Sequence, residues 1–402
     1  MFRIACSHDR PGPKPRWRTG TGSCCERPGS LSLTSDCHGT HIPSSLGASD
    51  LLENLVAAYY KCRRRKRYRQ PATEFDFAWE ENLLRLQRDL LGGTYEHGKY
   101  YHFHISDPKP RKISAAPFRD RIVHHALVSV LEPIFERQFI FDSYACRVGK
   151  GTHRAIRRAQ HFQRRFKWCL KTDIVRFFPN VDHQILLGVL SKRIADERVM
   201  HLIRLILRSG EGVLADEATQ CWFPGDDLLA VLRPKGLPIG NLTSQFFANV
   251  FLDPIDHFIK EQLRLPGYVR YADDLLLFGD SRATMWDAAK CLSDELSANR
   301  LRLHPNKTHL SPTSLPITFL GLRVSKNQLR LSQQSIQRFT RRVRRQKYAF
   351  AQHQLEFSDV SSSLQAWLAH CSHTNSSGLR KSLAMHLCFR RVKRAKPSPK
   401  KS

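Results

Sequence analysis

The chain has 402 residues, enough to bury a large core and to divide into two or three lobes. It carries 65 lysines and arginines against 36 acidic residues, a formal net charge of +29, which predicts a polyanionic partner with nucleic acid as the default. The absence of a long apolar run excludes an integral membrane protein, and the N-terminus turns polar almost at once, so we expect a cytoplasmic protein without membrane contact. Its 11 cysteines are scattered without a CxxC pair, which favours reduced thiols over a disulfide scaffold.

Residues 1–49 differ from the rest of the chain. Glycine, proline, serine, threonine and cysteine dominate there and apolar periodicity is absent, which predicts a disordered segment or a non-native extension upstream of the true start. Zinc binding is the alternative, although the spacing matches no usual finger, through Cys24, Cys25, Cys37, His38 and His41.

Two amphipathic helices are predicted next. The first begins at Ser49 or Asp50 as its cap and keeps apolar residues at helical spacing through Tyr59. The second extends from Trp79 to a stop at the glycine pair 92–93. The first helix ends in a basic run that is either a solvated face or a phosphate-binding surface, formed by Arg63, Arg64, Arg65, Lys66 and Arg67.

A pair of short strands with a basic tip is predicted to follow. Aromatic and β-branched residues alternate in KYYHFHIS, 99–106, and the turn DPKPRKIS, 107–114, supplies the basic tip. A helix then begins at Pro117 and keeps apolar residues at helical spacing through Leu131.

Two acid-bearing strands are predicted in the central part of the chain. LKTDIVRFFPNVD, 170–182, has apolar and β-branched residues around Asp173 and ends in a Pro-Asn turn. GYVRYADDLLLF, 267–278, places Asp273 and Asp274 between residues that otherwise predict a buried strand. We expect the two strands to be neighbours whose carboxylates converge, and like charges in a partly dry site need a compensating cation such as Mg²⁺. This arrangement implies two-metal phosphoryl transfer.

The tetrapeptide YADD, 271–274, resembles the catalytic box of reverse transcriptases. Other boxes of that family have counterparts in the same order, and the resemblance covers about 50–325. Asp173 with Phe177 and Phe178 is similar to the first acid box, RDRIVHH (119–125) to the fingers box, GLPIGNLTSQ (236–245) to the template-and-nucleotide loop, and Lys307 with FLG (319–321) to the last two palm boxes.

This resemblance implies an α+β right-hand polymerase fold. Fingers and palm, with an antiparallel sheet and helices, would cover 50–325. Residues 326–390 are helical and basic in pattern, which suits a thumb that grips an RNA/cDNA duplex through its phosphates. Residues 391–402 would be a disordered basic tail. The thumb residues expected to bind nucleic acid are Arg341, Arg342 and Arg344.

The loop at 236–245 narrows the resemblance. Most reverse transcriptases related to group II introns have glutamine before its glycine and proline after its serine, whereas this chain has Ile239, Gly240, Ser244 and Gln245. That form is typical of the reverse transcriptases of diversity-generating retroelements, and DSYACRVGKGTH (142–153) and WFPGDDLL (222–229) also look like that group.

The resemblance implies a prokaryotic or phage-encoded enzyme that copies a template-repeat RNA. It would produce cDNA with errors at adenines, which replaces a variable region of a target gene by mutagenic retrohoming. Its partners would be the template-repeat RNA, dNTPs and a small basic accessory protein encoded nearby. Two alternatives stay open: an antiphage or retron-type reverse transcriptase, and a maturase-like protein that binds group II intron RNA.

Roles of the acids follow from the resemblance and from their chemistry. Asp173 and Asp273 should bind two Mg²⁺ ions, which Mn²⁺ could replace, and Asp274 either supports them or is a turn acid. Phe178 would pack against the sugar of the incoming dNTP and exclude a 2′-hydroxyl. Phe177 would lie on the opposite face of an extended segment and pack in the core.

Further dNTP contacts are expected from the fingers tip and the palm loops. Arg111, with Lys112 beside it, would clamp the triphosphate because a guanidinium fork binds phosphate in a bidentate way; a solvated basic loop is the alternative. Lys307 would donate a proton to the leaving pyrophosphate or neutralise it, unless it is an ordinary surface lysine.

Ile239, before Gly240, is the most informative departure from the intron pattern, since isoleucine offers shape but no hydrogen bond. Losing polar contacts at the pairing site would permit about tenfold more error for each ~1.4 kcal/mol. An inert hydrophobic wall is the alternative. Ser244 and Gln245 would contact nucleic acid. The acid pair Asp226 and Asp227 follows a glycine without a flanking strand and predicts a loop rather than a metal site.

Overall fold

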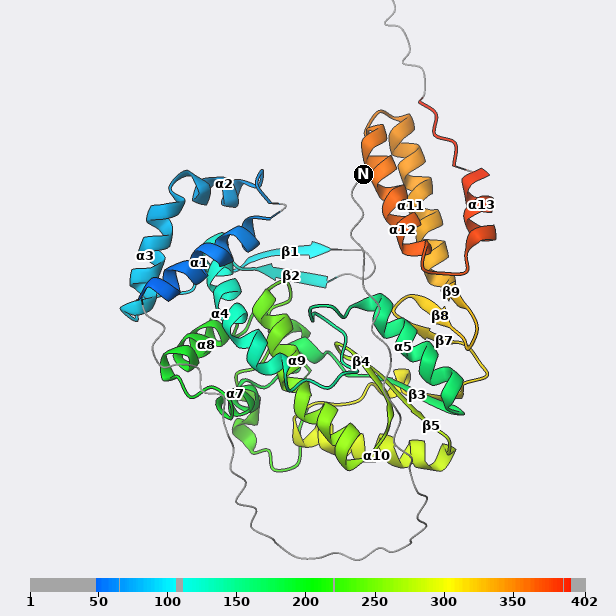
Figure 1. Ribbon diagram of the computed structural model, residues 1–402, viewed down its shortest axis with the longest axis horizontal. Helices are drawn as coiled ribbons and strands as arrows, with labels where there is room; N and C mark the ends of the chain where they lie inside the picture. The colour runs from blue at the N-terminus through cyan, green and yellow to red at the C-terminus, as the bar shows by residue number, and fades with distance from the viewer. Residues whose placement is uncertain (1–47, 65, 106–110, 220, 386, 392–402) are drawn as a thin grey trace, which may run out of the picture. The chain divides into compact units, whose positions relative to one another are not determined.

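The computed structural model describes residues 48–64, 66–105, 111–219, 221–385 and 387–391, and Figure 1 shows the order of their helices and strands. The predictions for residues 1–47, including the zinc alternative, and for the tail 392–402 lie outside the described residues. Among the helices within these ranges, we find none with the length and apolar character needed to cross a membrane.

Four helices build the predicted fingers around a shared apolar core. The three helices predicted to begin near Ser49, Trp79 and Pro117 are confirmed. The helix from Trp79 ends before Gly92, and Gly93 follows with a φ of +68°; Pro117 precedes the last helix of the group. Buried apolar side chains at helical spacing, such as Leu55, Leu83 and Ile122, meet in this core. The helices are α1 (Ala48–Arg63), α2 (Gln70–Phe77), α3 (Trp79–Leu91) and α4 (Phe118–Glu136).

A two-stranded hairpin extends from this helical group, as predicted. Strand β1 (Tyr101–Ile105) pairs antiparallel with β2 (Arg111–Ala115), so that Ile105 lies opposite Arg111 and Tyr101 opposite Ala115. The hairpin turn, 106–110, lies outside the described residues.

The centre of the molecule is a four-stranded antiparallel sheet. Its order is β4 (Gly267–Tyr271), β5 (Asp274–Gly279), β3 (Trp168–Asp173) and β6 (His309–Pro312). The two acid-bearing strands are therefore direct neighbours, which confirms the prediction.

The central sheet is buried on both faces, because alternate side chains of each strand enter different cores. Leu275 and Leu277 of β5 pack in one core with α9 (Leu242–His257) and α10 (Arg282–Ala298). Leu276 and Phe278 enter the other core with α5 (Thr152–Arg165). The first core also takes in α7 (His183–Ser191) and α8 (Glu197–Ser209).

The predicted strand at 170–182 is only partly correct. Strand β3 ends at Asp173, because Ile174 forms an isolated bridge with Leu303 and the N–H of Val175 donates to the carbonyl of Arg302. Arg176 then adopts a left-handed φ of +41°, which turns the chain into the short helix α6 (Phe177–Asn180). Phe177 is buried in the core as predicted, but from a helix rather than from an extended segment.

The C-terminal part contains a small sheet followed by helices. Stacked rings of Phe339 and Trp367, with centroids 3.8 Å apart, join the first two helices. The predicted boundary at 325 falls between two strands of the small sheet, so strands precede the helices of the predicted thumb. The elements are β7 (Ile317–Phe319), β8 (Leu322–Val324), β9 (Leu329–Leu331), α11 (Gln333–Ala351), α12 (Phe357–Cys371) and α13 (Ser377–Met385).

Candidate active site

The YADD tetrapeptide forms the turn between β4 and β5. Tyr271 pairs with Asp274, which leaves Ala272 and Asp273 as the two residues of a tight hairpin loop. Ala272 has a φ of +53°, a left-handed value that two-residue hairpins commonly require. The turn therefore presents Asp273 at its tip and starts the next strand with Asp274.

Asp173 lies directly opposite Asp274 in the ladder between β3 and β5. The backbone N–H of Ile174 donates to the carbonyl of Asp273 at 3.3 Å, which ties the end of β3 to the turn. Three carboxylates thus meet at one end of the central sheet. The predicted convergence is confirmed, and it depends on strand register, which sequence distance alone does not reveal.

Burial and mutual repulsion disfavour the charged form of two carboxylates in this cluster. Burial raises the pKa of Asp274 to about 6, and the charge of Asp273 adds to the effect. Burial also raises the pKa of Asp273, followed by the charge of Asp173, while Arg111 and Lys307 act in the opposite direction. The Nζ atom of Lys307 lies 3.0 Å from Oδ1 of Asp173. This lysine therefore belongs to the site, and the acids still favour a further cation.

The three acids fit a hard divalent metal ion that arrives with its substrate. Within the described ranges, no group of three or more His, Cys, Asp or Glu side chains is arranged as a ready-made metal cage. Magnesium, however, is commonly held by one or two carboxylates together with water and substrate phosphates. The three side chains Asp173, Asp273 and Asp274 offer oxygen donors only, and the raised pKa values of Asp273 and Asp274 show that burial disfavours their charge, which matches that mode.

Phe178 lies close to the acid-bearing strand and is half-buried against the core. Its carbonyl accepts a hydrogen bond from the N–H of Leu237 at 2.8 Å. This bond joins the segment after β3 to the loop at 236–245. A movement of that loop would consequently shift the backbone of Phe178.

The loop at 236–245 docks along the outer edge of β2. The N–H of Ser114 donates to the carbonyl of Ile239 at 2.8 Å, and Asn241 Nδ2 donates to the carbonyl of Ser114, also at 2.8 Å. Gly240 has a φ of +118°, and an added Cβ would lie 2.8 Å from Ile113. Glycine is thus required there both by conformation and by space.

Asn241 is a positioning residue that sequence reasoning missed. Its side chain is buried; besides donating to Ser114, it accepts from the N–H of Ala116 at 3.1 Å. Its place just before α9, where asparagine is a common cap, was the available signal. Its side chain makes no cap bond and instead joins fingers to palm.

The two cations at the fingers hairpin behave differently. Arg111 is exposed, and its positive charge lowers the pKa of Asp273. It therefore lies near enough to the acids to interact with them electrostatically. Lys112 is partly buried and donates through Nζ to the carbonyl of Val213 at 3.1 Å. Lys112 therefore anchors the hairpin in this structure.

The expected nucleic-acid contacts are also divided. Ser244 is buried in α9, so its side chain does not face a nucleic acid and that expectation is corrected; the neighbouring Gln245 is exposed. Arg63 is bound to Asp76 at 2.6 Å, so its charge is already paired. Among the other candidates, Arg65 lies outside the described residues, Lys66 and Arg342 are partly buried, and Arg64, Arg67, Arg341 and Arg344 are exposed.

Asp226 of the acid pair in the 222–229 segment has a structural role, in a loop as predicted. Asp226 forms an ion pair with Arg233, and Arg300 Nε lies 3.7 Å from the same carboxylate. The side chain of Asp226 also accepts from the N–H of Phe223. These partners satisfy its charge without a metal.

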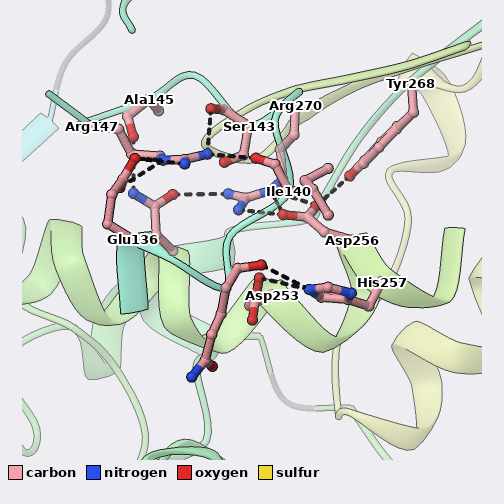
Figure 2. A network of polar contacts seen from close by, with 12 residues as sticks. Glu136, Ile140, Ser143, Ala145, Arg147, Asp253, Asp256, His257, Tyr268 and Arg270 are labelled. Carbon is pink, nitrogen blue, oxygen red and sulfur yellow. Dashed lines mark hydrogen bonds and ion pairs between the residues drawn. The ribbon is translucent and has the colours of Figure 1, made fainter. Parts of the chain in front are cut away.

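A buried polar network joins α9 to β4 (Figure 2). Asp256 on α9 accepts from Arg270 Nη2 at 2.6 Å, from Arg270 Nε at 2.8 Å and from the hydroxyl of Tyr268 at 2.7 Å. Asn249 Oδ1 accepts from Arg270 Nη1 at 3.0 Å. The side chains of Arg270 and Asp256 are 1% and 0% exposed. Arginine inside the otherwise apolar GYVRYADD strand was the overlooked signal.

The same network holds the segment after α4 against β4. The N–H of Arg270 donates to the carbonyl of Asp142 at 2.9 Å, and its carbonyl accepts from Tyr144 at 3.0 Å. Asn249 Nδ2 donates to the carbonyl of Ala145 at 2.9 Å. The residue that precedes YADD is therefore fixed through both its backbone and its side chain.

Comparison with known families identifies the chain. Residues 106–324, more than half of its length, match the family described as "Reverse transcriptase (RNA-dependent DNA polymerase)". The chain belongs to the reverse transcriptase family. The fold of this reverse transcriptase is accordingly the polymerase fold of that family over residues 106–324, and its family works on RNA templates and dNTPs with divalent metal ions.

Similar proteins include a group II intron-encoded protein and an intron maturase. Protein YkfC of Escherichia coli is 25% identical over 295 residues, 63% of this chain and 74% of that protein. The group II intron-encoded protein LtrA of Lactococcus lactis is 25% identical over 185 residues, 45% of this chain and 29% of LtrA. Nuclear intron maturase 2 of Arabidopsis thaliana is 29% identical over 143 residues, 32% of this chain and 20% of the maturase.

Among solved structures, apo telomerase of Candida tropicalis aligns with a TM-score of 0.42 and 12% identity, over 62% of this chain and 60% of that one. Compared with the relatives named in the previous paragraph, this reverse transcriptase spans about three quarters of YkfC but less than a third of LtrA and of nuclear intron maturase 2.

Proposed function

We propose that the chain synthesises DNA on an RNA template with Asp173, Asp273 and Asp274 as its catalytic acids. The observation that carries the proposal is the register of β3 and β5, which brings Asp173 opposite Asp274 and beside the turn that holds Asp273. Two Mg²⁺ ions bound there would supply the positive charge needed to activate the primer 3′-hydroxyl and stabilise the leaving pyrophosphate. The acids would hold and orient those ions.

The surrounding residues would position the dNTP. Arg111 is exposed on the hairpin, its positive charge lowers the pKa of Asp273, and it would bind the triphosphate through its guanidinium fork. Lys307 would exchange its contact with Asp173 for the β,γ-phosphates and donate a proton as pyrophosphate leaves. Phe178 would lie under the sugar and exclude a 2′-hydroxyl. Ile239 and Gly240 would shape the pocket for the new base pair.

The test of polymerase activity is primer extension with dNTPs and Mg²⁺ on an RNA template, comparing the native chain with Asp273→Ala. Asp287→Ala is the matched control, since Asp287 is an exposed acid on α10. We expect extension by the native chain and by the control but not by Asp273→Ala. Equal extension by both variants would refute the assignment of the acids.

We further propose the diversity-generating subtype, in which a template-repeat RNA is copied with errors at adenines. The support is the IGNLTSQ form of the palm loop, in which Ile239 offers no side-chain hydrogen bond. A small basic accessory protein and an imperfect repeat pair encoded nearby would be its partners. A gene without such surroundings would favour the antiphage or retron-type alternative.

Fidelity is the test of the subtype. Sequencing the cDNA should reveal misincorporation concentrated opposite template adenine, with the accessory protein added if its gene is found. Ile239→Gln restores a hydrogen-bonding side chain and should reduce these errors by roughly tenfold. Accurate copying by the native chain would contradict the subtype. High error unchanged by the substitution would remove Ile239 as its cause.

A second candidate function is binding of intron RNA as a maturase. The similarity to the intron-encoded protein and to the nuclear maturase favours it. Such a role would not depend on the acids. Asp273→Ala should therefore retain any splicing assistance measured on a group II intron RNA, while losing primer extension.

A further inference from the structure

A small cavity lies between three stretches of chain, which supply the residues 175–182 after β3, 219–235 before the palm loop, and 300–302 after α10. Hydrogen bonds tie these walls together. The N–H of Val175 donates to the carbonyl of Arg302 at 2.9 Å, and the N–H of Thr219 donates to Asn180 Oδ1 at 3.0 Å. The cavity has a volume of about 50 Å³, which is room for roughly three or four water molecules or one small ion.

Positive charge exceeds negative charge in the lining of this cavity. Its acidic members are Asp182 and Asp226, and its basic members are Arg233, Lys235, Arg300 and Arg302. Asp226 is paired with Arg233, and Asp182 accepts from Arg300 Nη1 at 2.6 Å. Two of the four cations therefore compensate the two carboxylates, and the other two leave an excess of two positive charges.

Lys235 and Arg302 carry this excess. Lys235 Nζ donates to the carbonyl of Thr219 at 3.4 Å, and Arg302 Nη2 donates to the carbonyl of Trp222 at 2.7 Å. Within the part of the chain that the structure describes, neither of them is paired with a carboxylate. Both retain N–H donors, since an ammonium group has three and a guanidinium group has five. Arg302 is exposed and Lys235 is half-buried, so a ligand can reach them from solvent.

Thr219 adds a hydroxyl without a partner to the same lining. Its Oγ1 atom is buried and has no hydrogen-bond partner among the residues that the structure describes. A buried polar atom that stays unpaired is costly, so a native structure usually provides a ligand or another partner for it. An anion in the cavity would accept a hydrogen bond from this hydroxyl as well as from Lys235 and Arg302.

We propose that the cavity binds a phosphate dianion through Lys235, Arg302 and the hydroxyl of Thr219. A phosphate with one or no ester bond carries a charge of about −1.5 to −2 near pH 7, which matches the excess in the lining. Its oxygens accept several charge-assisted hydrogen bonds at once. The volume admits one such group and not a triphosphate. Two sources provide this chemistry: inorganic phosphate, and the terminal 5′-phosphate of a nucleic-acid strand.

A bound phosphate would stabilise the base of the proposed dNTP site without touching the dNTP. Lys235 directly precedes the palm loop, and Leu237 of that loop donates to the carbonyl of Phe178. Arg302 is hydrogen-bonded to Val175, two residues after Asp173. An anion held between Lys235 and Arg302 would therefore fix the loop against the segment that follows β3. The site itself does not depend on the proposed polymerase activity.

The experiment measures thermal unfolding of the full-length chain in increasing sodium phosphate at pH 7.5, against sodium chloride at equal ionic strength. The midpoint of the native chain should rise with phosphate until it saturates, which gives a dissociation constant. Lys235→Met with Arg302→Met should raise that constant roughly tenfold or more, because two charge-assisted hydrogen-bond donors are lost. Thr219→Val should also raise it, with no change in charge.

Two control variants separate this cavity from the general positive charge and from the acids. Arg193→Met with Lys290→Met removes the same charge from exposed positions and should keep the native dissociation constant. Asp273→Ala should keep it as well, since Asp273 does not line the cavity. A chain that binds phosphate in this way but never extends a primer would refute the proposed function and leave the site standing.

A pair of otherwise identical RNA/DNA duplexes, one with a 5′-phosphate and one with a 5′-hydroxyl, distinguishes the two sources. If the cavity holds a strand end, the native chain should bind the phosphorylated duplex more tightly, and the Lys235→Met, Arg302→Met variant should lose that preference. If inorganic phosphate is the ligand, the native chain should bind both duplexes alike. Three results would overturn the site: no saturable effect beyond that of chloride, an undiminished effect in the Lys235→Met, Arg302→Met variant, or an equal loss in the Arg193→Met, Lys290→Met control.

Discussion

Two groups of acids lie near β4, one at its turn into β5 and one on α9, and they differ in how their charges are compensated. The first, Asp173, Asp273 and Asp274, has Lys307 as a close cation, and the pKa values of Asp273 and Asp274 are raised. The second centres on Asp256, which accepts three hydrogen bonds from Arg270 and one from Tyr268. The first group retains uncompensated negative charge, which suits the binding of a cation. The charge of Asp256 in the second group is fully paired, which suits a role in stabilising the fold.

This comparison separates loss of activity from loss of stability. A carboxylate in the first group repels its neighbours, so removing one relieves the fold while it removes a metal ligand. A charge in the second group is buried and paired, so removing its partner leaves an uncompensated charge in the core. Substitutions in the first group should therefore reduce activity without reducing stability, and substitutions in the second group should reduce stability.

The largest expected effect is on activity, from Asp173→Asn. The substitution keeps the shape of the side chain but removes a negative charge from the first group, and primer extension should fall by roughly 10³-fold or more. Thermal unfolding should show a midpoint equal to or above that of the native chain. A variant that lost activity because its midpoint had fallen sharply would contradict the division between the groups.

The second effect is on stability, from Arg270→Met. It leaves Asp256 buried without its ion-pair partner and should reduce the free energy of unfolding by about 3–5 kcal/mol. Urea denaturation measures the change. Combining it with Asp256→Leu removes the orphaned charge and should recover much of the loss. If the double variant were as unstable as the single one, the buried charge would not be the cause.

The third effect concerns Asp253, which lies on α9 near the second group. Burial, followed by the charge of Asp256, raises the pKa of Asp253 to about 6. Since a raised carboxyl pKa means that the folded state disfavours ionisation, stability is greatest while Asp253 is protonated and decreases as pH rises through about 4 to 6.

Asp253→Asn tests that sign. It should stabilise the chain at pH 7.5 by roughly 2–3 kcal/mol and make little difference near pH 4, as measured by urea denaturation at both values. Asp287→Asn, at an exposed position, should change neither. A difference that grew toward low pH would reverse the assignment.

The smallest expected effect is on stability, from a substitution at Gly240 in the palm loop. Gly240→Ala requires a strained φ and a shift of Ile113, which should cost about 1–3 kcal/mol and displace the loop from β2. Gly188→Ala in α7 is the matched control, because nothing lies within 4 Å of its added Cβ and alanine favours a helix. Greater stability in Gly188→Ala with an unaffected Gly240→Ala would show that the close approach at Gly240 is tolerated.

Local patterns in the sequence determined the elements and the acids. Apolar residues at helical spacing located α1 and α3, and alternation around a basic turn located the β1–β2 hairpin. Asp173 and Asp273 stood out because each interrupts an apolar strand, where a charge is costly without a function. These features are legible because they depend on residues close together in the chain.

The tertiary structure decided which side chains meet. It pairs Asn241 with Ser114, Lys307 with Asp173 and Arg270 with Asp256, and it buries Ser244 where an exposed contact was expected. It also ends β3 at Asp173, since Ile174 bridges Leu303 and Val175 donates to the carbonyl of Arg302. Hydrogen bonds between distant segments, and the face on which a helix is buried, depend on packing of the whole chain, which no local pattern of residues contains.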